Sequence, residues 1–527
     1  MYYSEREIMP GTEKINRKAA RGKPTRASSS PPTEAPPIGV SDAGYGITMP
    51  SPRSPSAAQA ILLGSAAGQL CLALIITVYL ARALSPAAFG FFSLVSTIFI
   101  LARKFLDLGL SNVAARDIAA DPRREKPILE GLMAYRRVAG LVMALAMCAF
   151  AFTQNSEAQR AILLGVGFVL LLTEPAALDP VFQVRQAQGG LALLNLLGGV
   201  IVLTGSILFN RLELTGTGFA WLLVIREAVV LLFTQVMADR LLGYHPKPGF
   251  RERGLRDFVG PALLFGLASL VYTIYFHCDV FFVYALRGQA ELGAYAAAFR
   301  PINPLLLLPW LLMVPMIPVL ASLANTDGER FVRQVRSACN FALGLGGCGL
   351  VGGSLLAREL LQLLYRGRYL AGALSCIDAL RWLAIALGMV CITTVLTASL
   401  LAKRSEKLLL QIGIAALLVN AAINLVLLQK HNFTAAALAT AATELLYLIC
   451  ALAAFQFVTG RSAVTWRSAM YLFPAVIMGV ILRFVPGNAA LRVTCGIALG
   501  ILAAAAILFS PEARRFRKEM KAASPVF

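Results

Sequence analysis

Two short segments, AAFGFFSL (87–94) and ELGAYAAA (291–298), open the second and the eighth of the long apolar stretches in this chain. Each follows a short loop that carries an arginine. Aligning Gly90 with Gly293 gives an offset of 203 residues and puts an aromatic residue two positions later in both segments, Phe92 and Tyr295. The alignment predicts that the chain consists of two related halves.

The apolar stretches are long enough to cross a membrane, since about 20 apolar residues span the hydrocarbon as a helix. Each predicted half holds six of them, and an even number makes the two halves run in the same direction, around an axis along the membrane normal. Two further stretches follow the second half. The fourteen predicted spans are 57–81, 89–110, 131–153, 161–179, 190–209, 215–238, 258–285, 291–323, 338–363, 374–402, 408–428, 434–458, 468–485 and 491–510.

The composition supports this interpretation. Of the 527 residues, 58% are apolar and only 14% are charged, and the mean hydropathy is +0.70. A soluble protein of this size needs more polar residues to cover its surface. A cytosolic enzyme, a secreted disulfide scaffold and a disordered protein are therefore excluded. The predicted fold class is an all-α polytopic membrane protein of two six-helix bundles with a C-terminal helix pair.

The net charge of +20 follows the predicted topology. With the N-terminus inside, 31 of the 48 basic residues flank the cytoplasmic face and 10 flank the other face. Positive residues prefer the cytoplasmic side, so both termini are predicted to be cytoplasmic. The predicted parts are a disordered basic tail (1–56) near anionic lipid, a first bundle (57–240), a cytoplasmic linker (241–257), a second bundle (258–460), helices thirteen and fourteen (461–510) and a basic tail (511–527).

The sequence offers no metal or nucleophile motif. Nine cysteines form no CxxC pair and lie mostly in apolar runs, where cysteine behaves as a small apolar residue. Only three histidines occur, far apart, and there is no Walker A motif. No cofactor, no metal and no enzymatic activity are expected.

Charged residues inside spans are the functional candidates, because each costs roughly 2.5–3.5 kcal/mol to insert. Guanidinium groups suit phosphate, since they bind two oxygens at once and stay charged. The candidates for a substrate-binding cavity are Arg300, Arg226, Asp279, Arg381, Lys104 and Asp107.

Several of these residues have a structural alternative. Asp378 with Arg381, and Lys104 with Asp107, lie three positions apart and can pair on one helix face. Asp279 can pair with Arg300 or bind a coupling proton or cation. The coupling candidates are Asp279, Glu174 and Asp179.

Two further patterns concern helix shape and packing. Five prolines fall between 301 and 318, where a straight helix over 291–323 would be about 50 Å long against a core of about 30 Å. This span is therefore predicted to bend, tilt or extend beyond the membrane, with Pro301, Pro304 and Pro309 as hinge candidates. Asn420 and Asn424 share one helix face and are predicted to bond to neighbouring helices.

Six segments of the chain, between about residues 60 and 460, together resemble one family. It is the family of bacterial polysaccharide repeat-unit flippases, which export O-antigen and exopolysaccharide units and belong to the multidrug/oligosaccharidyl-lipid/polysaccharide exporter superfamily. The segments are VYLARALSPAAFG (78–90), DLGLSNVAARDIA (107–119), HCDVFF (277–282), ELGAYAAAFR (291–300), VNAAINLVL (419–427) and AAALATAATE (435–444).

The resemblance implies a cargo and a place of action. The cargo is an oligosaccharide on undecaprenyl pyrophosphate, moved from the inner to the outer leaflet of the bacterial cytoplasmic (inner) membrane through a cationic cavity. Asp279 and Arg300 match the second-half motif, and Asp107 and Arg116 match the first-half motif. The implied partners are this lipid-linked oligosaccharide, anionic lipid and the polymerase or glycosyltransferase machinery.

Three alternatives stay open from the sequence. A lipid II flippase shares the architecture. A drug/cation antiporter of the same superfamily predicts an acidic, aromatic-lined cavity, against which the arginines speak. A membrane polysaccharide polymerase predicts a large external loop, which this sequence lacks.

Overall fold

The computed structural model describes residues 55–212, 216–249, 252–313 and 316–509. The two predicted basic tails lie almost wholly outside these ranges. All described residues belong to one compact unit, and the regular structure in them is helical throughout. The predicted all-α class is confirmed.

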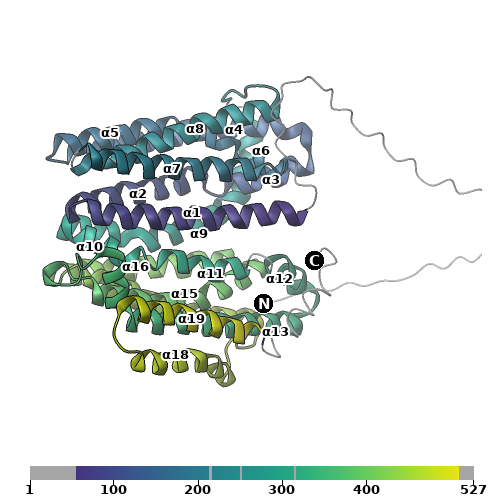
Figure 1. The fold of residues 1–527 in the computed structure, drawn as a ribbon. Coiled ribbons are helices and arrows are strands. Elements are labelled where there is room, and N and C mark those ends of the chain that lie inside the picture. Colours follow the sequence, from purple (N-terminus) through teal and green to yellow (C-terminus); the bar gives the residue numbers. More distant parts are fainter. Residues whose placement is uncertain (1–54, 213–215, 250–251, 314–315, 510–527) are drawn as a thin grey trace, which may run out of the picture. The chain divides into compact units, whose positions relative to one another are not determined.

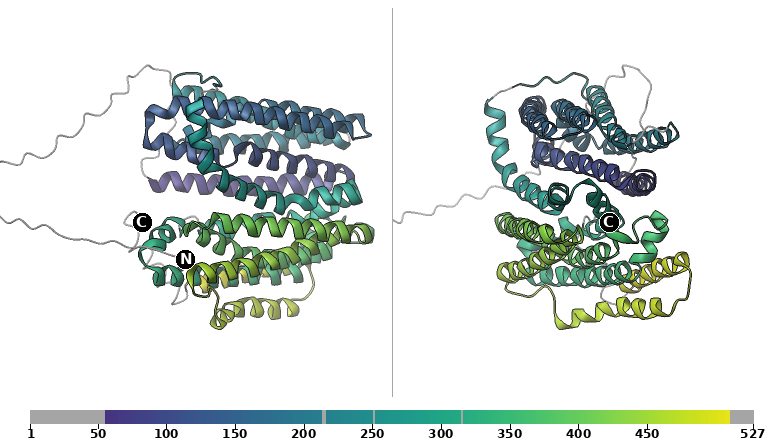
Figure 2. Two further views of the ribbon diagram at one scale, coloured as in Figure 1. Left: turned by 180° about the vertical axis from the view of Figure 1, so that it is seen from behind. Right: turned by 90° about the vertical axis from the view of Figure 1, so that its left-hand side faces the viewer.

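The described residues of the first half form eight α-helices and three 3-10 helices. Helices α2, α4, α5, α7 and α8 run side by side, as the two directions of view agree (Figure 1, Figure 2). The elements are α1 (Pro55–Ala83), α2 (Pro86–Asp107), α3 (Leu110–Ala120), η1 (Pro122–Arg124), α4 (Glu125–Phe152), α5 (Glu157–Leu171), η2 (Glu174–Leu178), α6 (Asp179–Val184), α7 (Gln188–Arg211), η3 (Gly216–Ala220) and α8 (Trp221–Leu242).

The second half starts at α9, inside the predicted linker, and ends with α17. Two appended helices, α18 and α19, follow. The elements are α9 (Glu252–Arg287), α10 (Gln289–Phe299), α11 (Asn303–Met313), α12 (Met316–Thr326), α13 (Gly328–Leu355), α14 (Ala357–Tyr365), η4 (Gly372–Leu374), α15 (Ile377–Ala402), α16 (Glu406–Lys430), α17 (Thr434–Thr459), η5 (Trp466–Leu472), α18 (Phe473–Phe484) and α19 (Ala489–Leu508).

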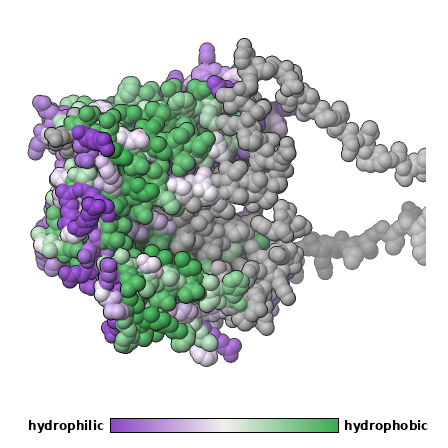
Figure 3. All heavy atoms as spheres, in the orientation of Figure 1, coloured by the Kyte–Doolittle hydropathy of each residue, from purple (hydrophilic) through white to green (hydrophobic). Residues whose placement is uncertain are grey.

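Twelve helical segments in the described residues are long and apolar enough to cross a membrane, and they match twelve of the fourteen predicted spans. A broad apolar band covers these helices, while hydrophilic residues gather at the end where α1 stops (Figure 3). The two remaining predictions are the first and the eighth span. The first is α1, and the eighth is divided into α10, α11 and α12, each of 11 residues.

The eighth predicted span is interrupted between α10 and α11, within its proline-rich part. Helix α10 ends at Phe299, and Pro301 lies in the break before α11. Pro304 falls in the first turn of α11, where a missing backbone donor has no effect on the helix, whereas Pro309 lies inside that helix. A proline interior to a helix removes one backbone hydrogen bond, so the break and the interior proline together bend this span.

Helix α3 is an element that was not predicted from the sequence. Its charged residues favour a loop, yet Leu110, Ala114 and Ile118 recur every four positions and are buried. This face packs on α6. Leu108 and Gly109, both left-handed with φ of 41° and 72°, turn the chain from α2 into α3.

The two halves meet at the repeated segments. A methyl group on Gly90 would lie 2.0 Å from the carbonyl oxygen of Gln289, and one on Gly293 would lie 2.0 Å from that of Pro86. The offset between Pro86 and Gln289 is again 203 residues. Helices α2 and α10 thus pack backbone against backbone around a local two-fold axis, and only glycine fits at both positions.

Arginines reinforce the same end of the interface. The Nε of Arg82 donates to the carbonyl of Leu364 at 2.6 Å, and the guanidinium of Arg368 donates to the carbonyls of Arg82 and Leu84 at 2.8 and 2.6 Å. Each arginine therefore caps the C-terminus of a helix in the other half, where carbonyls lack intrahelical partners.

Glutamine amides add to these bonds between the halves. Gln159 and Gln289 exchange two amide hydrogen bonds, of 2.9 and 3.0 Å, and Tyr284 donates to Gln154. We call the end of the helices where α1 stops and α2 begins the α1–α2 end. The arginine caps, the glutamine bonds and the glycine contact all lie there.

The appended pair packs on α13 through glycines. Methyl groups on Gly344, Gly347 and Gly352 would lie 2.3, 2.9 and 2.8 Å from side chains of Ile507, Leu472 and Met478. The glycine-rich face thus admits α18 and α19 close to the second half. Predicted spans thirteen and fourteen are both present as helices.

Replacing Gly293 by Ala is expected to destabilise the protein by about 1–3 kcal/mol, because the added methyl group meets a backbone carbonyl that cannot move aside. The midpoint of thermal unfolding in detergent measures this. Gly500→Ala is the matched control, since Gly500 is helical and a methyl group on it would have no other atom within 4 Å. An equal midpoint for the two variants would contradict the close contact between α2 and α10.

Candidate substrate-binding site

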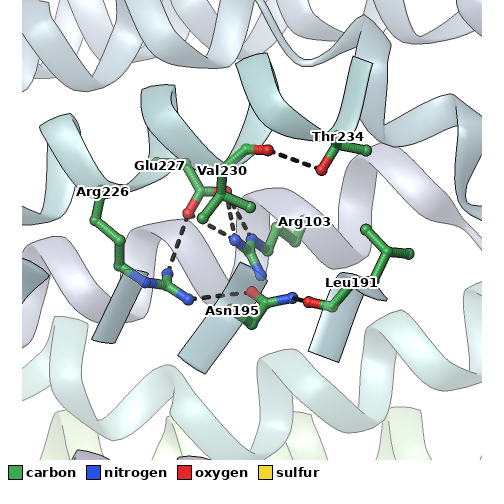
Figure 4. A network of polar contacts seen from close by, with 7 residues as sticks. All are labelled: Arg103, Leu191, Asn195, Arg226, Glu227, Val230 and Thr234. Carbon is green, nitrogen blue, oxygen red and sulfur yellow. Dashed lines mark hydrogen bonds and ion pairs between the residues drawn. The ribbon is translucent and has the colours of Figure 1, made fainter. Parts of the chain in front are cut away.

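The first half holds a network of two arginines around one carboxylate (Figure 4). Arg103 on α2 binds both oxygens of Glu227 on α8, at 2.5 to 2.9 Å. Arg226 donates to Glu227 at 3.2 Å and to the side-chain oxygen of Asn195 on α7 at 3.2 Å. Arg103 lies within the second predicted span, and its partner Glu227 lies on another helix.

The network carries a net positive charge. Glu227 is the buried member, with 5% of its side chain exposed, while Arg103 and Arg226 keep 46% and 24% exposed. Arg226 is also surrounded closely by protein. Two guanidinium groups thus share one carboxylate and retain free donors for an anion.

The acidic candidates of the first half have partners other than those predicted. Asp107 does not pair with Lys104, which is exposed. It accepts from the buried Arg136 at 3.1 Å and from Ser111. The chain turns left-handed at Leu108, directly after Asp107, and carries the carboxylate toward α4 instead of along α2.

The two remaining coupling candidates of this half differ in environment. Glu174 forms an ion pair with Arg137 on α4. Asp179 lies at the start of α6, closely surrounded by protein, within the electrostatic range of Arg136, Asp107 and Arg103. Glu174 thus has an ion-pair partner, whereas Asp179 has none among the described residues.

In the second half, Asp279 is held by neutral groups. Tyr295 and Asn424 donate to its carboxylate at 2.9 and 2.8 Å, and Thr440 donates as well. The side chain is 2% exposed. The suggested pair between Asp279 and Arg300 is not formed, because hydroxyl and amide groups from α10, α16 and α17 surround the carboxylate.

A second buried carboxylate, that of Glu444, lies one helical turn after Thr440 on α17. Glu444 accepts from Tyr275 at 2.8 Å and is 2% exposed. Asn420 donates to Thr443 at 3.2 Å, which confirms that the two asparagines of α16 bond to neighbouring helices. Two side-chain hydrogen bonds thus connect α9 with α17, one from Thr440 to Asp279 and one from Tyr275 to Glu444.

Arg300 differs from the other arginines inside the spans. It follows α10 directly, at the break before α11. In the part of the chain that the structure describes, its side chain has no hydrogen bond or ion pair. The residue is nevertheless closely surrounded by protein atoms while part of its surface stays open. The half-buried guanidinium of Arg300 is thus open to a ligand.

His277 and Tyr272 on α9 show the same combination. Both are closely surrounded by protein, yet Tyr272 is 38% exposed and His277 is half-buried. His277 lies within the electrostatic range of Arg300. Neither residue was among the candidates from the sequence. The only sequence feature that could have indicated them is their spacing. Tyr272 and Phe276 lie four positions apart, on one helix face, and His277 follows directly.

Arg381 lies elsewhere. It forms an exposed pair with Asp378 at 2.9 Å, with roughly half or more of both side chains exposed, as the three-residue spacing suggested. The described residues also contain no group of three or more histidine, cysteine, aspartate or glutamate side chains able to hold a metal ion. The arrangement is therefore best suited to binding an anionic ligand through Arg300 and the Arg103–Arg226 network.

Two family models match the chain. A polysaccharide biosynthesis protein family matches residues 58–323, and the lipid II flippase MurJ family matches residues 193–502. Each match covers more than half of the chain. No curated protein matches it.

Solved structures share the fold. A lipid II flippase MurJ in an inward closed conformation has a TM-score of 0.66 at 14% identity, covering 88% of this chain and 99% of that one. A multidrug resistance MATE family transporter of the MOP superfamily, in an inward-facing conformation, has a TM-score of 0.52 at 16% identity, covering 76% and 95%. An outward-facing structure with the same family description has a TM-score of 0.51 at 17% identity, covering 79% and 96%.

The architecture of two related halves with an appended helix pair agrees with these matches. The helical fold is thus similar to those of MurJ and of the MATE transporters. The second of the two matched families is named for a flippase. The chain is a multi-pass membrane protein that belongs to the polysaccharide biosynthesis protein family over residues 58–323 and to the lipid II flippase MurJ family over residues 193–502.

Proposed function

We propose that this protein moves oligosaccharide repeat units on undecaprenyl pyrophosphate from the inner to the outer leaflet of the bacterial cytoplasmic membrane, for surface polysaccharide such as O-antigen or exopolysaccharide. The polysaccharide biosynthesis match over residues 58–323 supports this substrate class. The distribution of basic residues supports cytoplasmic termini, which puts the α1–α2 end outside.

Arg300 is the observation that carries the proposal. An unpaired guanidinium at membrane depth is costly, and a fixed position at a helix break keeps it from reaching the headgroups. A ligand with two phosphates satisfies it, because guanidinium binds two phosphate oxygens at once. The Arg103–Arg226 network offers further donors from the other half.

Transport by alternating access requires the two halves to separate at one end and then at the other. At the α1–α2 end, backbone contacts and arginine caps join them. We assign this end to the external gate, which separates to release the cargo. The break at Pro301, with Pro304 and Pro309 in α11, supplies a hinge between α10 and the rest of the span.

Lipid II is the second candidate cargo, because the MurJ model matches residues 193–502. It also carries a sugar on undecaprenyl pyrophosphate. The phosphate chemistry of the cavity is the same for both, so the sugar part and the biosynthetic context separate them.

Arg300→Ala is expected to lower surface polysaccharide by about tenfold or more in a complementation assay, since a charge-assisted contact contributes about 1.5–3 kcal/mol. Arg300→Lys should give an intermediate level, because an ammonium group cannot bind two oxygens in one plane. Arg381→Ala, in the exposed pair with Asp378, is the matched control and should export normally.

Full export by Arg300→Ala at normal protein level would remove Arg300 from the site. The same strains also decide the cargo. Rescue of cells depleted of their lipid II flippase, without restoration of surface polysaccharide, would assign the protein to lipid II.

Joining the two halves at the α1–α2 end is expected to stop flipping. Cysteines in place of Gln159 and Gln289, whose amides touch, can be bridged by a short bis-maleimide. Fluorescent lipid in proteoliposomes measures flipping. Each single variant and the wild type, treated identically, are the controls for reaction at the native cysteines. Undiminished flipping by the bridged protein would show that this end does not open.

The membrane potential alone is expected to sustain outward flipping, since a cargo with two negative charges gains about 2.3 kcal/mol per charge per 100 mV. Proteoliposomes with a potassium diffusion potential, but without a pH or sodium gradient, test this.

We further propose that Asp279 binds a coupling proton or cation that adds to this drive. Asp279→Asn should keep the potential-driven rate and lose any stimulation by the added gradients. Loss of flipping in the wild type when only the two gradients are collapsed would refute the potential-driven mechanism.

A further inference from the structure

A continuous row of aromatic rings runs along one side of α9. Tyr272 stacks on Phe276 with ring centroids 6.1 Å apart, and Phe276 meets Phe299 edge-on at 5.9 Å. Phe299 in turn stacks on Tyr295 at 6.2 Å, and Tyr272 meets Tyr447 at 6.2 Å. Aromatic pairs at these distances hold one another in place, so the row is a rigid wall.

The members of this row differ in exposure. Tyr275, Tyr295 and Tyr447 are at most 3% exposed, whereas Tyr272 is 38% exposed. The ring of Tyr272 thus leaves a face free for a ligand, although many protein atoms lie around this residue. Phe276, next to it in the row, is half-buried.

Polar donors stand at the edge of this open face. The ring of Phe276 meets that of His277 edge-on at 5.7 Å. His277 makes no hydrogen bond or ion pair within the described ranges, and Arg300 is its electrostatic neighbour. An unbonded imidazole and an unpaired guanidinium thus lie beside an open aromatic face.

Two buried carboxylates of this half, Asp279 and Glu444, do not reach that face. Asp279 and Glu444 are each 2% exposed, and their oxygens accept hydrogen bonds from Tyr295 and Tyr275. A cationic aromatic ligand therefore meets arginine instead of carboxylate. An isoprenoid chain is apolar and cannot accept hydrogen bonds from the imidazole or the guanidinium. The surface suits a ligand with one apolar face, hydroxyl groups at its rim and an anionic attachment, which describes a sugar ring on phosphate.

We propose that Tyr272 and Phe276 form a subsite for the sugar ring that is joined directly to the pyrophosphate, with His277 donating a hydrogen bond to that sugar. This inference rests on the proposed function, because Arg300 holds the pyrophosphate beside it. The apolar C–H face of the sugar stacks on Tyr272, and the buried tyrosines behind keep that ring in place. In this arrangement Arg300 binds the two phosphates. Tyr272, Phe276 and His277 bind the sugar.

Binding of two purified lipids in detergent tests the assignment. One is undecaprenyl pyrophosphate, and the other is undecaprenyl pyrophosphate that carries a single N-acetylglucosamine or galactose. Tyr272→Leu should weaken binding of the glycosylated lipid by about tenfold, because it removes the ring and keeps an apolar side chain. Binding of the bare pyrophosphate should stay unchanged, and Tyr272→Phe should bind both lipids as the wild type does.

Two further variants complete the design. His277→Ala should weaken only the glycosylated lipid, and His277→Gln, which keeps an N–H donor, should restore part of the loss. Phe457→Leu replaces an aromatic ring that is 87% exposed and is the matched control. Unchanged binding of the bare lipid also shows that each variant is folded.

The outcomes separate this inference from the proposed function. Equal weakening of both lipids by Tyr272→Leu, or weakening of neither, would overturn the sugar subsite. If the wild type binds neither lipid, or if Arg300→Ala weakens neither, the proposed function itself fails. Tight binding of both lipids with dependence on Arg300 alone leaves the function standing and removes the aromatic subsite.

Discussion

The backbone contact between Gly90 and Gly293 is the constraint on which the arrangement of the halves depends. It brings α2 and α10 closer than any side chain allows. The residues around Gly293 extend its effect. Glu291 accepts a hydrogen bond at 2.9 Å from the backbone N–H of Phe433, at the start of α17, and Tyr295 donates to Asp279 on α9. This part of α10 therefore holds α2 of the first half, and α9 and α17 of the second half, in place.

The cost of charge inside a membrane explains how the polar residues are distributed. In the first half, arginines and carboxylates pair across helices, as Arg103 does with Glu227. In the second half, neutral hydroxyl and amide groups satisfy Asp279 and Glu444. Arg300 has neither kind of partner in the described residues. A charge within a span is costly unless a partner or a ligand balances it, so the distribution of polar partners among the helices supports the anionic cargo proposed above.

The spans and the repeat were predictable from the sequence, because hydropathy and proline spacing are local properties. The broken eighth span, the appended pair and the asparagine bonds of α16 are as expected. The partners of the charged residues were less predictable. Asp107 bonds to Arg136 instead of Lys104, and Asp279 bonds to hydroxyl and amide groups instead of Arg300. Helix α3 was missed because its 11 residues are too few to span a membrane and include the adjacent charges Arg116 and Asp117.

The sequence by itself determined that this is a membrane protein of two parallel halves, since long apolar stretches have no other stable place and their order is covalent. It also determined which arginines lie within those stretches. Only the tertiary structure decided which of them is left without a partner. Glu227 lies 124 residues from Arg103, and Asn424 lies 145 residues from Asp279. Such pairs form when helices from distant parts of the chain pack together, and no local pattern encodes their distances.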